Sequence, residues 1–159
     1  FRMSKNKERD RLFKTYNSLY STHFSEDAKR NCCFYCGDVA GTVDHVPPLS
    51  WVESKTTKEW KKSKIPFVRI QCCVECNRML GSKPLFTVYE RVEFLEKKLL
   101  DQYEKRSTLW SKEEIAEMSA MFQRQIIAKQ NQAKQLLARA RGLQQRLMKF
   151  DSFPITHDF

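Results

Sequence analysis

The apolar positions in the second half of the chain follow a helical period. One set recurs every three or four residues and predicts a helix over about 86–105: Val88, Val92, Leu95, Leu99 and Tyr103. A second set alternates steps of three and four, as in the seam of a coiled coil: Ala133, Leu136, Ala140, Leu143, Leu147 and Phe150. It predicts a long helix from about 111 to 150, interrupted only at Gly142. This seam must be buried, either on the helix of 86–105 or on a second copy of the chain.

Helix-start signals agree with both of these helices. Thr87 with Glu90, and Ser111 with Glu114, have the spacing of a capping box. Near the other end of the chain, "SKNKERDRLFKTYNSLY" (4–20) has apolar side chains at helical spacing and predicts a short helix. Four residues give that helix a basic face: Lys5, Lys7, Arg9 and Arg11.

The segment between these helices, residues 32–83, has no long period and carries all 6 cysteines. Strands are expected near 40–46 and 67–72, and a short helix over 74–82 that ends at Gly81. The predicted fold is therefore α+β and mainly helical. It divides into three parts: an N-terminal basic helix, 1–31; a cysteine-bearing core, 32–84; and a C-terminal helical extension, 85–159.

The charge of the chain favours a polyanionic partner, because 29 basic and 19 acidic side chains leave a formal net charge of +10. Nucleic acid is the simplest such partner, although ordinary solubility explains the charge equally well. No apolar run reaches about 18 residues, so no membrane-spanning helix is predicted. The polar N-terminus predicts no signal peptide, and an intracellular, cytoplasmic location is expected.

The cysteines form two clusters, "CCFYC" (32–36) and "CCVEC" (72–76), each with a C-x-x-C pair. Two such pairs can surround a structural Zn²⁺ ion with four thiolates, which is the usual role of this spacing in an intracellular protein. The predicted ligands are Cys33, Cys36, Cys73 and Cys76. Cys32 and Cys72 are left over. Each can replace its neighbour as a ligand, or can be a small buried residue on the strand before the pair.

An Asp-His pair, Asp44 and His45, follows the first cysteine cluster, and Asn77 directly follows the last predicted ligand. Zinc binding would bring all three into one neighbourhood. A neutral imidazole can act as a base near pH 7, and carboxylate and amide oxygens suit a hard divalent cation. The alternatives are a zinc ligand for His45 and a turn carboxylate for Asp44. The other histidines, His23 and His157, have polar neighbours and are predicted to face solvent.

Three stretches together, "CFYCG", "TVDHVPPLS" and "CVECNRMLGSK", resemble the zinc-bearing branch of the HNH endonucleases, the ββα-metal (His-Me) finger nucleases. The resemblance covers about residues 33–83. It implies a small zinc-stabilised core of two strands and a helix, with His45 as the general base. Asp44 and Asn77 match the ligands of the catalytic Mg²⁺ or Mn²⁺ ion, and Pro47 matches the proline that ends the first strand.

The activity that the resemblance implies is hydrolysis of phosphodiester bonds, which would nick or cleave DNA in a bacterium or a phage-infected host. The family usually has an Asn before the second cysteine pair, and this Asn orients the histidine. The corresponding stretch, "IPFVRIQ" (65–71), contains no Asn, so a backbone carbonyl is the expected partner of His45. The helix position more often holds His than the Asn77 found here.

Basic residues near these motifs are candidates for contact with nucleic acid. The lysine-rich stretch 53–64 is predicted to be an exposed insertion whose Trp60 stacks on a base, or else a solvated loop with Trp60 packed on the core. The candidate set is Lys58, Trp60, Lys61, Lys62, Lys64, Arg78 and Lys83. Two other functions remain open for the chain. It could be a non-catalytic zinc-finger module that binds nucleic acid or protein, or an assembly protein that forms a homodimer through the C-terminal helix.

Overall fold

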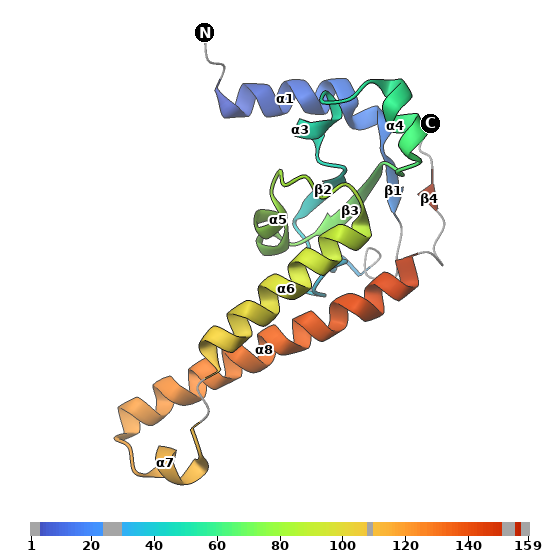
Figure 1. Ribbon diagram of the computed structural model, residues 1–159. Helices are drawn as coiled ribbons and strands as arrows, with labels where there is room; N and C mark the ends of the chain where they lie inside the picture. Colours follow the sequence, from blue (N-terminus) through green and yellow to red (C-terminus); the bar gives the residue numbers. More distant parts are fainter. Residues whose placement is uncertain (1–3, 24–29, 108–109, 151–154, 157–159) are drawn as a thin grey trace.

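The computed structural model describes residues 4–23, 30–107, 110–150 and 155–156 (Figure 1). It is a mixed α/β structure in which helix predominates, and this confirms the predicted class. The elements are α1 (Lys5–Tyr16), η1 (Asn17–Leu19), β1 (Ser21–His23), β2 (Thr42–Val46), α3 (Leu49–Val52), α4 (Thr57–Ser63), β3 (Val68–Cys72), α5 (Val74–Leu80), α6 (Val88–Arg106), α7 (Lys112–Ala116), α8 (Ala120–Phe150) and β4 (Ile155–Thr156).

The strands form one small sheet in the order β2-β3-β1-β4. The predicted strands near 40–46 and 67–72 are confirmed as β2 and β3, which pair antiparallel with Thr42 opposite Cys72. β1 runs parallel to β3, and β4 runs antiparallel to β1. Neither of these two strands was predicted, because segments of 3 and 2 residues are too short to show an alternating pattern.

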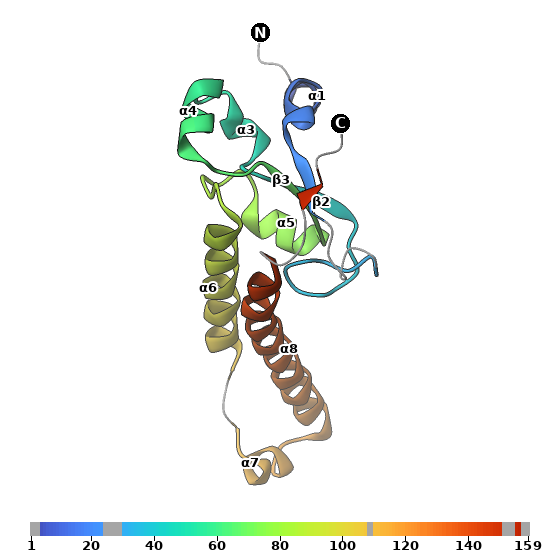
Figure 2. The same cartoon turned by 90° about the vertical axis from the view of Figure 1, so that its right-hand side faces the viewer.

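The two C-terminal helices α6 and α8 lie side by side and form an arm that extends away from the sheet (Figures 1 and 2). The apolar seam of α8 is buried against α6, mainly at Ala133, Leu136, Ala140, Leu143 and Phe150. Of the two predicted ways to cover this seam, the intramolecular one is therefore found, and its burial requires no second copy of the chain.

The long C-terminal helix begins later than predicted. Ser111 and Glu114 form the expected capping box, but the helix that they start, α7, ends at Ala116. The chain turns there, and the hydroxyl of Ser119 accepts a hydrogen bond from the backbone N–H of Phe122 at the start of α8 (3.4 Å). The predicted interruption at Gly142 is wrong, because α8 continues through it.

Gly142 instead provides space for a contact between α8 and the first cysteine loop. The guanidinium group of Arg146 packs over Gly142 and over Gly37 of the first cysteine loop. It also donates a hydrogen bond to the backbone carbonyl of Tyr35 (3.3 Å). A side chain at position 142 would collide with that guanidinium, so the glycine allows α8 to pack against the cysteine loop.

The lysine-rich stretch 53–64 is not a simple exposed insertion. Part of it forms α4, and Trp60 is buried on the core, where its indole N–H donates to the backbone carbonyl of Val52 (2.9 Å). Its ring packs edge-on against Phe67 and Phe86. The α4 lysines are exposed as predicted, but burial removes Trp60 from the residues available to stack on a base.

The histidine prediction is wrong at His23, whose side chain is only 3% exposed. It lies between Phe150, with which it stacks, and Phe34, and this burial lowers the pKa of His23. The polar sequence around it gave no sign of this, because Phe150 arrives from the far end of the chain. His157 lies outside the described residues. In the described part of the chain, no helix has both the length and the apolar character needed to cross a bilayer.

Candidate functional site

The first candidate site is the cluster of four buried cysteines. Each C-x-x-C pair lies in one tight turn: the first pair precedes Gly37, and the second begins helix α5. Gly37 has φ +82°, a conformation that suits glycine, and its N–H bonds back to the carbonyl of Cys33. The ligand atoms of Cys33, Cys36, Cys73 and Cys76 all lie within 4.8 Å of one another. This confirms that the four predicted residues come together.

The spacing of the sulfur atoms suits a tetrahedral metal centre. The Sγ atoms of Cys36 and Cys73 are 3.6 Å apart. A zinc–sulfur bond of about 2.3 Å in a tetrahedron places two sulfurs about 3.8 Å apart. Backbone N–H groups of Cys36 and Cys76 point at the sulfurs of Cys33 and Cys73 (3.5 and 3.3 Å), and such contacts stabilise thiolate charge. The cluster can therefore hold a structural metal ion such as zinc.

The structure also separates the ligand candidates from the two remaining cysteines. Cys72 ends β3, where its sulfur contacts the hydroxyl of Thr42 (3.3 Å) instead of the cluster. Burial raises the pKa of Cys72 to about 12, so it stays a neutral thiol. The sulfur of Cys32 contacts the backbone carbonyl of Arg30 (3.5 Å). Neither cysteine belongs to the group of four. Cys72 is a buried strand residue, as the second predicted role has it, whereas Cys32 is only half-buried.

Helix α8 contributes a cation to this site that the motifs did not indicate. Arg139 forms ion pairs with Glu75 (3.1 Å) and Asp38 (3.5 Å) on either side of the cluster. Hydrogen bonds from the thiols of Cys33 and Cys76, together with one from Arg139, lower the pKa of Cys36. Four thiolates around a divalent ion carry a net charge of about −2, and a neighbouring guanidinium offsets part of it. Arg139 lies one turn from Leu136 and Leu143 of the seam, which is the only sequence signal for it.

The second candidate site is a cleft of about 760 Å³ between α1 and α5, with β2 at its floor. The cleft is lined by Asp44, His45 and Asn77, among others. Within the described part of the chain, its lining includes none of the four clustered cysteines. The three residues predicted to do chemistry are thus brought together in one open cleft, separate from the cysteine cluster.

His45 is held in one orientation by the N-terminal part of the chain. Its Nε2 atom lies 2.9 Å from the side-chain oxygen of Asn17, in η1. With that oxygen as acceptor, Nε2 carries the proton and Nδ1 keeps its lone pair. The rings of Phe13 and Tyr20 contact the imidazole edge-on. Burial, followed by the charge of Arg69 and of other arginines, lowers the pKa of His45 to about 4, so the ring is neutral at pH 7.

Asn17 is a functional candidate that sequence reasoning missed. A backbone carbonyl was the expected partner of His45, and the structure supplies a side-chain amide instead. Asn17 precedes His45 by 28 residues and lies outside all three motifs. Only the packing of α1 and η1 against β2 brings the two side chains together, so no spacing in the sequence could have indicated the pair.

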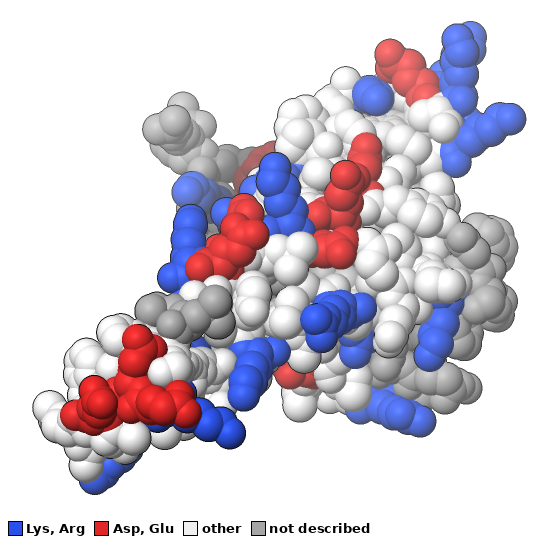
Figure 3. Space-filling view, turned by 60° about the horizontal axis from the view of Figure 1, so that its bottom comes forward, with Lys and Arg blue, Asp and Glu red and all other residues white. Residues whose placement is uncertain are grey.

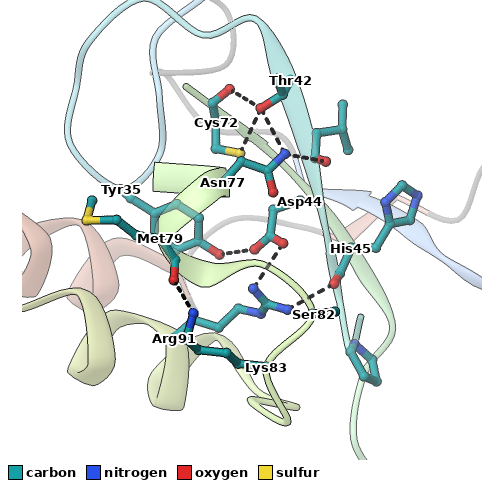
Figure 4. A network of polar contacts seen from close by, with 12 residues as sticks. Tyr35, Thr42, Asp44, His45, Cys72, Asn77, Met79, Ser82, Lys83 and Arg91 are labelled. Carbon is teal, nitrogen blue, oxygen red and sulfur yellow. Dashed lines mark hydrogen bonds and ion pairs between the residues drawn. The ribbon is translucent and has the colours of Figure 1, made fainter. Parts of the chain in front are cut away.

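Asp44 is buried and held by two side chains from other parts of the chain (Figure 4). One carboxylate oxygen lies 3.1 Å from the guanidinium of Arg91, on α6, and the other accepts a hydrogen bond from the hydroxyl of Tyr35 (2.7 Å). Burial raises the pKa of Asp44 to about 6, although Arg91 and Tyr35 both lower it. Arg91 is itself fully buried and also donates to the backbone carbonyl of His45 (3.4 Å).

Arg91 was also missed, although the sequence contained a signal for it. It stands three residues after Val88, on the same helical face as Val92 and Leu95, and this face was predicted to be buried. A charged residue on such a face needs a buried partner. Asp44 is that partner.

Asn77 completes the set from helix α5. Its amide nitrogen donates to the hydroxyl of Thr42 (3.1 Å) and points to the carbonyl of Val43 (3.5 Å). In Figure 4 the amide oxygen is turned toward Asp44. The carboxylate and this oxygen form a donor set of the kind that Mg²⁺ and Mn²⁺ take in proteins. Asp44 and Asn77 therefore supply the type of oxygen atom that a hard cation binds. One oxygen of the Asp44 carboxylate is already paired with Arg91.

The predicted nucleic-acid-binding residues are spread over three places. Arg78 lines the cleft beside Asn77. The amine of Lys83 donates to the backbone carbonyl of Met79 (2.7 Å) and lies over the ring of Phe94. The exposed α4 lysines, Lys58, Lys61, Lys62 and Lys64, do not line the cleft in the described part of the chain.

Comparisons with protein-family models, with curated proteins and with solved structures found no match to this chain. The resemblance to HNH endonucleases therefore rests on the three motifs between residues 33 and 83. The structure of this chain adds two observations. Four cysteines lie close enough together to hold a metal ion, and a separate cleft contains the neutral His45 with the oxygen donors Asp44 and Asn77.

Proposed function

We propose that this protein is an HNH-type endonuclease that nicks DNA by divalent-metal-dependent hydrolysis. The observation that carries the proposal is the convergence of Asp44, His45 and Asn77 in one open cleft, apart from the cysteine cluster. The order of elements supports it as well. β2 and β3 pair antiparallel, with α3 and α4 between them in the chain, and α5 directly follows β3, an order that fits the two strands and a helix that the resemblance implies. Asp44 and His45 lie on the first of these strands, and Asn77 lies on the helix.

His45 is the general base in this proposal. The side-chain oxygen of Asn17 accepts a hydrogen bond from Nε2–H, so the lone pair of Nδ1 can take a proton from an attacking water. Because burial and nearby arginines keep the ring neutral, the base is in its active form at pH 7. Asp44 and Asn77 would hold Mg²⁺ or Mn²⁺, which when bound stabilises charge on the phosphate and on the leaving oxygen. Arg91 and Tyr35 position the Asp44 carboxylate.

We further propose that the ion in the cysteine cluster is zinc and that its role is structural. Four thiolates complete a tetrahedral zinc shell and leave no position for a water or a substrate. The cluster also joins the first cysteine loop to α5, which carries Asn77. Bound zinc would therefore keep Asn77 at a fixed position relative to β2.

A second candidate function is a non-catalytic zinc module that binds nucleic acid in the cleft. The observation in its favour is the state of Asp44, which is 3% exposed and already paired with Arg91. A carboxylate neutralised by a protein cation has less need of a metal ion. In this alternative the cleft binds a phosphodiester backbone and hydrolyses nothing.

Nicking of supercoiled plasmid, with and without added Mg²⁺ or Mn²⁺, separates the two functions. The wild-type protein is expected to nick only with the divalent cation, and His45→Ala to lower the rate by about 10²–10⁴-fold. Ser50→Ala, in the same cleft lining, is the matched control and should nick at the wild-type rate. Zinc content and circular dichroism should be unchanged in both variants. A wild-type protein without nicking activity would favour the binding module, and an active His45→Ala variant would remove His45 as the base.

A further inference from the structure

We propose that the α1 wall of the cleft is a phosphate-binding surface, and that a nucleic-acid backbone lies between α1 and α5, held by Lys5, Arg9 and Arg78. The partner class rests on the proposed function, but the binding itself needs neither the His45 base nor a divalent cation. This places the nucleic acid on the N-terminal helix, and not on the α4 lysines that the sequence indicated.

The cations of the cleft stand on both of its walls. Lys5 and Arg9 are one helical turn apart on α1, so they share a face, and both line the cleft. Arg78 lines the opposite wall on α5. The positive charge of Arg9 acts on His45 at the floor of the cleft. After burial and the charge of Arg69, it is a further cause of the lowered pKa of His45. A backbone that follows the cleft would thus pass His45 with cations on either side.

The carboxylates of the cleft do not cancel these charges. Glu8 lines the α1 wall but is paired with Arg11 (2.6 Å), and Asp44 on the floor is paired with Arg91. Lys5, Arg9 and Arg78 form no ion pair with any residue in 4–23, 30–107 or 110–150. The cleft therefore has three cations without an ion-pair partner among the described residues, and such cations can bind phosphate and release counterions.

Not all of the predicted basic face of α1 takes part. Arg11 is engaged by Glu8 and by Glu53 of the α3–α4 connection (2.7 Å), so its charge is already used within the protein. Lys7 is exposed on the other side of the helix and does not line the cleft in the described part of the chain. Of the four residues of the predicted basic face, the proposal therefore uses Lys5 and Arg9 and leaves out Lys7 and Arg11.

Charge at the far end of the molecule argues against the tip of the arm as a binding surface. Acidic side chains gather on the tip of the arm (Figure 3), where α7 and its C-terminal cap carry Glu113, Glu114 and Glu117. A polyanion is repelled there. The cleft lies at the opposite end, beside α1 (Figure 1).

Binding of a short fluorescent DNA duplex, measured by anisotropy at several salt concentrations without added divalent cation, tests this placement. The probe variant is Lys5→Gln with Arg9→Gln. The matched control is Lys7→Gln with Lys14→Gln, which removes the same charge from the opposite face of the same helix. The probe variant should reduce the slope of log K against log salt by about two, and weaken binding at least about tenfold at low salt. Arg78→Gln should reduce the slope by about one.

The competing surface is tested by Lys58→Gln with Lys61→Gln on α4. The proposal is overturned if this variant loses more binding than Lys5→Gln with Arg9→Gln, if the two α1 variants behave alike, or if the wild-type protein does not bind. Thermal unfolding of every variant shows whether the fold is kept. Failure of the nuclease proposal would look different: the salt slope would still depend on Lys5 and Arg9, but plasmid would stay intact.

Discussion

The cysteine cluster and the cleft lie side by side in the same core, but their polar groups are satisfied in different ways. The four clustered thiols face mainly one another, with Arg139 beside them. In the cleft, each group proposed for chemistry already has a partner from another element. Asp44 has Arg91 and Tyr35, His45 has Asn17, and Asn77 has Thr42, as separate contacts.

This difference leads to a different metal requirement being expected for each site. Thiolates brought together without a cation repel one another, so the cysteine cluster is stable as an anion only around an ion. The cleft is organised by the protein itself, through an ion pair and hydrogen bonds. Loss of the metal should therefore disrupt the cysteine cluster, and loss of a partner side chain should disrupt the cleft. The following three experiments test this.

The largest effect is expected from the cysteine ligands. Cys73→Ala should abolish zinc binding and unfold the core, because zinc binding contributes about 10–16 kcal/mol in isolated finger peptides. Cys72→Ala is the matched control, since its sulfur contacts Thr42 and lies outside the cluster. Metal analysis and circular dichroism should find about one zinc per chain in Cys72→Ala and little in Cys73→Ala. Equal zinc content in the two variants would contradict the ligand assignment.

An intermediate effect is expected from the buried ion pair under the cleft. Arg91→Met should destabilise the protein by about 3–5 kcal/mol, because it leaves the Asp44 carboxylate buried without its cation. The double variant with Asp44→Asn should recover much of that loss. Urea unfolding measures both, and the zinc content should not change. If Arg91→Met unfolds at the wild-type urea concentration, the pair does not organise the cleft.

The smallest effect is expected from the partner of His45. Asn17→Ala should lower the nicking rate by about 10- to 100-fold, because a misoriented base is a poorer one. KM and thermal stability should stay near wild type, which separates a positioning role from a structural one. Asn17→Asp keeps an oxygen acceptor and should restore part of the rate. A loss of stability that accounts for the whole loss of rate would instead assign Asn17 a purely structural role.

Much of the candidate site could be predicted from the sequence because its motifs are local. A C-x-x-C pair lies in one turn, and an Asp-His pair lies on one strand, so spacing alone indicates what these residues can bind. The partners that set their chemistry are not local. Asn17 lies 28 residues from His45, Arg91 lies 46 residues from His45, and Arg139 lies at least 64 residues from its partners. Arg91 and Arg139 each left a sequence signal, as a charge next to the apolar positions of a helix, and Asn17 left none.

The sequence by itself determined the elements whose pattern is long or strongly capped: α6, most of α8, the β2–β3 pair and the cysteine turns. Tertiary structure alone decided the rest. It turned the chain at 117–119, buried Trp60 and His23, and made α1 a wall of the cleft. The physical reason is that hydrophobic periodicity and turn spacing act over a few residues. Burial, ion pairing and the orientation of a side chain depend on which distant elements pack against each other.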